Sequence, residues 1–60
     1  MLKVKLFDEE HELDLEEAIN LFLKDFEGII LNISYQVALA MNGKEMEYCY
    51  SAMIFYQEKE

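Results

Sequence analysis

The stretch Ile29 to Ala40, which reads IILNISYQVALA, decides the fold of this chain. One parity of its positions is apolar throughout, and the other carries asparagine, serine and glutamine, which is the period-two pattern of an amphipathic strand. Asn42-Gly43 follows, and this pair is preferred in two-residue type I′ turns. We therefore expect a β-hairpin in which this strand turns back into another, from Met46 to Tyr56.

A turn at Asn42-Gly43 fixes the pairing of the two hairpin strands, because Met41 then pairs with Lys44 and all other partners follow. The pairs expected on the apolar face are Leu39 with Met46, Val37 with Tyr48, Tyr35 with Tyr50, Ile33 with Ala52, and Leu31 with Ile54. Aromatic and β-branched pairs of this kind stabilise sheets. The hairpin is thus predicted to have one face that is apolar along its whole length.

The amino-terminal half predicts a strand and a helix. Apolar residues alternate with lysines from Leu2 to Phe7, which indicates a strand with Leu2, Val4 and Leu6 toward the core. Asp8 stands where a helix N-cap is expected, and Gly28 where a left-handed residue ends a helix, so we expect a helix from about Glu9 to Phe26. Its apolar stripe comprises Leu15, Ala18, Ile19, Phe22 and Phe26, with His11 at its amino-terminal end.

These elements give one α+β domain, residues 1–60, in the order β-α-β-β. The strand at Met46 to Tyr56 is apolar on both faces for much of its length, which suits the centre of a three-stranded antiparallel sheet of order 1-3-2. One helix covers only one face of such a sheet. On the open face we expect an apolar surface for self-association, formed by Phe7, Ile30, Met53 and Phe55, with Cys49 nearby.

Composition argues against several classes of partner. The net charge is −8, from thirteen carboxylates and five lysines, and the chain has no arginine. Binding to nucleic-acid backbones or anionic membranes rests on a basic surface, so we expect neither. The lone cysteine, Cys49, closes no intrachain disulfide, and no apolar run has the length of a signal sequence or a membrane span. We expect a cytoplasmic protein.

Nothing in the sequence indicates catalysis or a cofactor. The carboxylates of the acidic run from Asp8 to Glu17 spread around the predicted helix, and His11 is the chain's only histidine, so metal ligands do not converge there. Cys49, Ser34 and Ser51 lack a recognisable activating pattern, and no phosphate-binding or dinucleotide-binding motif is present. We therefore expect a protein that is not an enzyme and has no cofactor.

Several segments resemble a known family. They are residues 3–12 (KVKLFDEEHE), Asp14-Leu15, Ala18-Ile19-Asn20, Tyr35-Gln36-Val37 and residues 48–52 (YCYSA). These segments are similar to the small acidic sporulation protein family of endospore-forming bacteria, which is expressed in the mother cell under sigma-E control. The resemblance implies a role in sporulation in the bacterial cytoplasm. It implies no mechanism and assigns no catalytic or binding residue.

The leading functional hypothesis is a non-enzymatic domain that forms a homodimer or a larger homo-oligomer. Burial of each large apolar side chain on the open face would contribute about 1.5 to 3 kcal/mol, which is large beside the stability of so small a domain. The alternative is an acidic decoy or adaptor that binds a basic partner protein. A third class, an enzyme that uses His11 with carboxylates, has no further support in the sequence.

Overall fold

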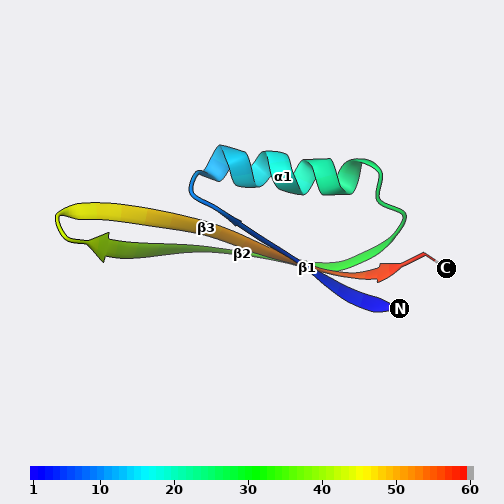
Figure 1. Cartoon of the computed structure of the whole chain (residues 1–60). Helices are drawn as coiled ribbons and strands as arrows, with labels where there is room; N and C mark the ends of the chain where they lie inside the picture. Colours follow the sequence, from blue (N-terminus) through cyan, green and yellow to red (C-terminus); the bar gives the residue numbers. More distant parts are fainter. Residues whose placement is uncertain (60) are drawn as a thin grey trace.

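The computed structural model describes residues 1–59, and Asn42 by its backbone alone. The elements are β1 (Leu2–Glu9), α1 (Glu12–Lys24), β2 (Gly28–Asn42) and β3 (Glu45–Glu58). They form a three-stranded antiparallel sheet of order β1-β3-β2 with the helix on one face (Figure 1). The predicted β-α-β-β fold and its strand order are confirmed.

The helix begins later than the sequence predicts. Asp8 is not an N-cap, because it continues β1 and pairs with Ser51, as Glu9 pairs with Tyr50. His11 takes the N-cap position with extended backbone angles, φ −131° and ψ 141°, and its carbonyl accepts a hydrogen bond from the Leu15 amide at 3.1 Å. Pairing with β3 therefore extends β1 to Glu9, past Asp8, where the local sequence pattern alone places the start of the helix.

The helix also ends earlier than predicted, at Lys24, and Gly28 is not its terminating residue. Gly28 is the first residue of β2, with φ 145°. A Cβ atom at this position would collide with the backbone carbonyl oxygen of Gln57 on β3. Glycine is needed here because a strand begins beside another backbone, which is a different reason from the predicted one.

The hairpin turns one residue later than predicted. Asn42 pairs with Glu45, so Gly43 and Lys44 form the two-residue loop. Gly43 has φ 67° and Lys44 has no positive φ, which is the pattern of a type II′ turn and not of type I′. The register is consequently shifted by two residues.

From Asn32 to Met41 the two-residue shift leaves each side chain of β2 on its predicted face, because side chains alternate with a period of two, whereas Ile30 changes face beyond an irregularity in the strand. The observed pairs on the apolar face are Met41 with Met46, Leu39 with Tyr48, Val37 with Tyr50, Tyr35 with Ala52, and Ile33 with Ile54. An irregularity between Ile30 and Asn32 leaves Leu31 without a direct partner, so its predicted pairing with Ile54 is wrong.

The faces of β1 are the reverse of the prediction. Phe7 pairs with Ala52 and Lys5 with Ile54, so the odd-numbered residues of β1 lie on the helix side of the sheet. Leu2, Val4 and Leu6 lie on the side without a helix, and all three are exposed. Alternation shows that a strand has two faces, but pairing with β3 decides which of them the helix covers.

The core is small and lies under the helix. Leu15 of α1 and Ala52 and Ile54 of β3 are the buried hydrophobic residues of the described chain. An aromatic cluster extends this core toward the carboxyl end of the helix, with ring centroids 5.3 to 6.0 Å apart; its members are Phe7, Phe22, Phe26 and Tyr56. The helix stripe predicted from the sequence therefore packs on β1 and β3, except that His11 precedes the helix and is exposed.

The molecule is long and thin, with principal extents of 49 × 18 × 11 Å. The helix lies over one half of the sheet, while the β2–β3 hairpin continues beyond it as a two-stranded ribbon (Figure 1). Both termini lie at the opposite end from the hairpin turn (Figure 1). Half of the helix-side face of the hairpin is therefore left uncovered.

Candidate self-association surface

The uncovered ribbon begins where β1 ends. β1 pairs with β3 from Tyr50 to Gln57, so residues Glu45 to Cys49 of β3 have β2 as their only neighbouring strand. Their partners on β2 are Ala38 to Asn42. We call residues 38–49 the arm. Two-stranded ribbons are at best marginally stable in water without a further packing surface, so the arm is the least supported part of the sheet.

The helix side of the arm is apolar. Its side chains, with that of Val37 at the base of the arm, form what we call the apolar arm face: Val37, Leu39, Met41, Met46 and Tyr48. Their exposed fractions range from 46% for Tyr48 to 65% for Met41. No member of this face carries a charge, and nothing in the described chain covers it.

The opposite side of the arm has a different chemistry. The register places Ala38, Ala40, Glu45, Glu47 and Cys49 on this side, and all five residues are exposed. Small and acidic side chains are suited to solvent, whereas the other side of the same ribbon carries large apolar ones. The arm is therefore amphipathic, with an apolar surface of the kind that usually packs against another layer.

The apolar surface continues from the arm along β2. No Cα of α1 lies within 8 Å of a described Cα of β2, so the helix leaves this edge strand open. Ile33 and Tyr35 are 47% and 57% exposed on the helix side. A hollow of about 230 Å³ lies between Tyr35 and the helix residues Leu15 and Ile19. The apolar arm face thus borders a shallow groove beside the helix.

Tyr50 marks the base of the arm. Its ring stacks on that of Tyr48, with centroids 6.2 Å apart. Burial raises the pKa of the Tyr50 phenol above its usual value, and the nearby Glu12 carboxylate adds to this effect. The first turn of the helix, with its acidic side chains, therefore lies close to the base of the arm.

The four residues predicted to form one self-association face lie on two different faces. Met53 and Phe55 are on the side without a helix, half-buried beside the exposed Leu6 and Val4 of β1, with which they pair. Phe7 and Ile30 lie on the helix side, where the ring of Phe7 is 6.0 Å from that of Phe22 and Ile30 pairs with Tyr56. The surface proposed from the sequence does not exist as one patch, because the parity of β1 and the irregularity in β2 were not visible in the pattern.

Sequence reasoning also missed the apolar arm face. It treated the apolar parity of the hairpin as core along its full length. The signal that could have found it is length: β2 and β3 have 15 and 14 residues, against 8 in β1 and 13 in the helix. At about 3.4 Å per strand residue and 1.5 Å per helix residue, the helix is too short to cover the hairpin.

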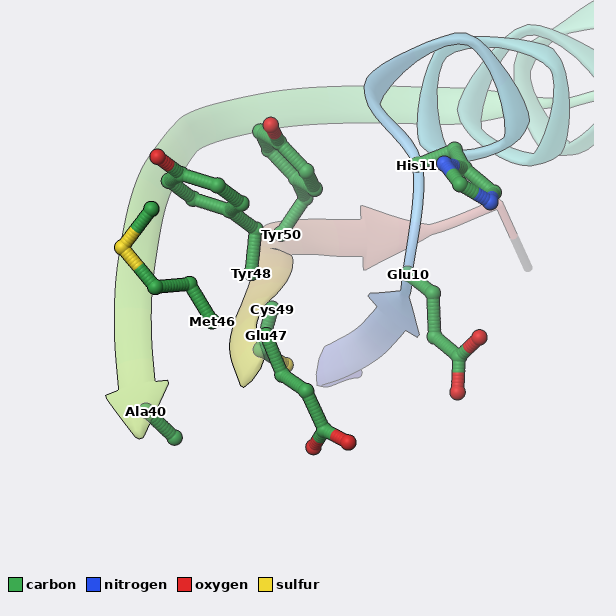
Figure 2. A pocket seen from close by; sticks show the side chains of 8 residues that line it. All are labelled: Glu10, His11, Ala40, Met46, Glu47, Tyr48, Cys49 and Tyr50. Carbon is green, nitrogen blue, oxygen red and sulfur yellow. The ribbon is translucent and has the colours of Figure 1, made fainter. Parts of the chain in front are cut away.

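A second hollow, of about 440 Å³, lies where β1 ends beside the arm. His11, Glu10, Glu47 and Cys49 line it, which are the residue types that metal or nucleophile chemistry would use. Figure 2 shows that the carboxylates of Glu10 and Glu47 point away from the imidazole of His11. Across residues 1–59, no three His, Cys, Asp or Glu side chains are grouped so that they could hold a metal ion.

Over the same residues, no helix has the length and apolarity needed to span a membrane.

Comparison with known proteins identifies the family. The chain is 48% identical over 60 residues to sporulation protein cse60 of Bacillus subtilis (strain 168), an alignment that covers 97% of this chain and all of that protein. No solved structure matches the chain. The family model described as sporulation protein Cse60 matches residues 1–58. The expected resemblance is confirmed, and the chain belongs to the Cse60 family of sporulation proteins.

Proposed function

We propose that this chain is a non-catalytic sporulation protein that works in the cytoplasm by self-association, and that the apolar arm face is the surface through which two copies bind. The observation that carries the proposal is the uncharged, half-exposed face of the arm, opposite a small and acidic one. Hydrophobic association needs such a surface, and it needs no catalytic group.

The size of the exposed surface supports a dimer. A compact monomer of this mass, 7.1 kDa, exposes about 4,100 Å². This chain exposes 5002 Å², an excess of about 900 Å², and a standard interface buries about 800 Å² on each partner. The radius of gyration, 13.8 Å, likewise exceeds the value of about 10 Å for a compact chain of this length. One interface of ordinary size would account for the excess.

The small core gives a second reason. Three buried hydrophobic residues within residues 1–59 are few for a chain whose single cysteine is free. Domains of this size commonly gain stability from an additional subunit. Burial of the apolar arm face would add a second core at the unsupported end of the sheet.

Electrostatics distinguishes self-association from the alternative, an acidic adaptor for a basic protein. Two copies each carry a net charge of −8 and repel each other at a distance. Salt screens that repulsion, so a dimer held by apolar contacts persists or tightens as salt is raised. An adaptor held to a basic partner by opposite charges weakens under the same change.

The decisive measurement is the mass of the purified protein by multi-angle light scattering, from low to high micromolar concentration and at two salt concentrations. A dimer whose affinity does not fall with salt is the expected result. A monomer throughout this range contradicts self-association. In that case, salt-sensitive binding to a basic protein would favour the adaptor.

A further inference from the structure

We propose that the two copies pack with their apolar arm faces together in antiparallel orientation, so that each arm lies end to end with the partner's helix. In this two-fold dimer the turn of each arm, Gly43-Lys44, reaches the amino-terminal end of the partner's α1. This inference rests on the proposed self-association and adds the geometry of the contact.

Lengths on the helix side of the sheet match. The thirteen residues of α1 span about 20 Å at 1.5 Å per residue. The strands of the arm, counted from the Val37–Tyr50 pair to the Asn42–Glu45 pair, also span about 20 Å at 3.4 Å per residue. The helix and the uncovered arm therefore have about equal lengths along the hairpin (Figure 1).

Layer thickness matches as well. Packed sheets lie about 10 Å apart, and a helix is about 10 Å thick. An arm laid on the apolar arm face of another copy would therefore occupy the layer that the helix occupies over the other half of the sheet. The dimer becomes a two-layer structure in which each layer contains one helix and one arm from different chains.

Steric exclusion sets the direction of the packing. In a parallel face-to-face arrangement, both helices would lie between the two sheets at the same end, since α1 sits on the same side as the apolar arm face. Two helix layers would hold the sheets more than about 20 Å apart, and the arms could not touch. The antiparallel arrangement places the helices at opposite ends and brings the arms into contact.

Side-chain chemistry is compatible with this direction. A two-fold interface uses one patch on both copies, so an axis near the Leu39–Tyr48 pair places the methionines of each tip against the base of the other arm. Met41 and Met46 would then meet Val37 and Tyr50 of the second copy. Methionine adapts its shape to such surfaces and makes favourable contacts with aromatic rings.

Charge at the two ends is complementary. Lys44 is the only basic residue of the arm and stands in its turn. Glu12 and Asp14 occupy the first turn of the helix, and Glu12 is near Tyr50 at the arm base. Glu45 lies on the other side of the ribbon by its pairing with Asn42. The antiparallel dimer thus brings the lysine of each tip toward carboxylates of the partner.

The test uses cysteine cross-linking in the Cys49→Ala background, with one cysteine per chain so that intrachain products cannot form. A short bis-maleimide reagent is added to a mixture of Lys44→Cys and Glu12→Cys proteins, both modified at exposed positions. A covalent heterodimer is the expected product. The matched control mixes Lys44→Cys with Lys24→Cys, at the far end of the helix, and should give no heterodimer.

Each outcome separates the geometry from the self-association. Efficient cross-linking of Lys44→Cys with itself would place the tips together and overturn the antiparallel arrangement. A dimeric mass without the Lys44–Glu12 product, or with an equal yield from the Lys24 control, would also overturn it while leaving self-association intact. A monomeric mass for the Cys49→Ala protein at high micromolar concentration would overturn both.

Discussion

Ile33 and Ile54 lie directly opposite each other in the hairpin, yet Ile54 is completely buried and Ile33 is 47% exposed. The boundary of the helix layer runs between them, since α1 packs over β3 and does not reach β2. The same residue type in the same sheet thus has two environments, and their energetic difference can be measured.

Replacing Ile54 with valine should destabilise the fold by about 1 kcal/mol, because a methylene is removed from a fully packed site. Ile33→Val is the matched control, and its effect should be much smaller. Urea unfolding, at a protein concentration too low for association, measures the free energy of unfolding of both variants. Equal losses would contradict the described position of the helix.

Leu39→Glu should weaken self-association more than tenfold, because it places a charge at the centre of the apolar arm face. Tenfold corresponds to about 1.4 kcal/mol, and burying an unpaired charge costs more than that. Sedimentation equilibrium gives the dissociation constant. Ala40→Glu lies one residue further along the same strand on the opposite side, and it should leave the constant nearly unchanged.

Amide hydrogen exchange in the arm should depend on protein concentration. In a monomer the arm is a ribbon with no further layer, so the amides of residues 38–49 should open readily. In the dimer they should be protected, while amides around Ile54 exchange slowly in both states. An arm protected equally at all concentrations would show that it needs no partner.

Substitution of the two glycines should have unequal effects. Gly28→Ala requires a positive φ and a Cβ atom in the space of the Gln57 carbonyl, so the ends of β2 and β3 must separate. Gly43→Ala meets open space and costs only its unfavourable φ, about 1 kcal/mol. Thermal unfolding of both variants tests the order, and a Gly43→Ala protein that is the less stable would contradict it.

The ion pair between Lys3 and Glu58 should give stability a pH dependence. The atoms Nζ and Oε2 are 2.8 Å apart, and the bond from Lys3 lowers the pKa of Glu58 below its usual 4.5 while Glu58 raises that of Lys3 above 10.5. A lowered carboxyl pKa stabilises the fold above pH 4.5, and this stabilisation is lost as the pH falls through the folded-state value. A raised lysine pKa stabilises it below pH 10.5, and this stabilisation is lost as the pH rises through the higher folded-state value.

Glu58→Gln should therefore reduce stability between these limits and leave it unchanged in strong acid. The effect should be small, because both side chains are about half exposed. Glu27→Gln is the control, since its carboxylate is 3.8 Å from Lys59 and more exposed. Denaturant titrations at pH 3 and pH 7 compare the variants, and an equal loss at both values would exclude the ion pair as the cause.

The sequence predicted the order of elements and the strand order because they depend on long patterns. The alternation also predicted correctly which residues of β3, and of β2 from Asn32 onward, share a face of the hairpin, but not the face of Ile30. The predicted register of the hairpin was wrong by two residues. Asn42-Gly43 and Gly43-Lys44 both suit a two-residue loop, and a shift by an even number of residues does not change the faces of the paired residues. Local pattern alone does not choose between them.

The surface was harder to predict than the fold. The leucines of β1 and its one phenylalanine, Phe7, have opposite parity, so hydrophobicity supports either face. The pairing of Phe7 with Ala52, which are far apart in the chain, decides that the face of β1 with Phe7 lies on the helix side. Which part of the hairpin the helix covers is likewise a tertiary property. Leu39 and Met41 lie beyond the helix and are exposed, although their sequence pattern is that of a core.

The pairing of Leu2 with Gln57 brings both ends of the chain to the same end of a molecule 49 Å long. The hairpin turn is at the other end (Figure 1). An affinity tag or a fluorescent protein fused at either terminus would therefore project away from the arm, with most of the length of the molecule between them. Fusions at both termini are suitable for following the protein in sporulating cells without blocking the surface that we propose for dimerisation.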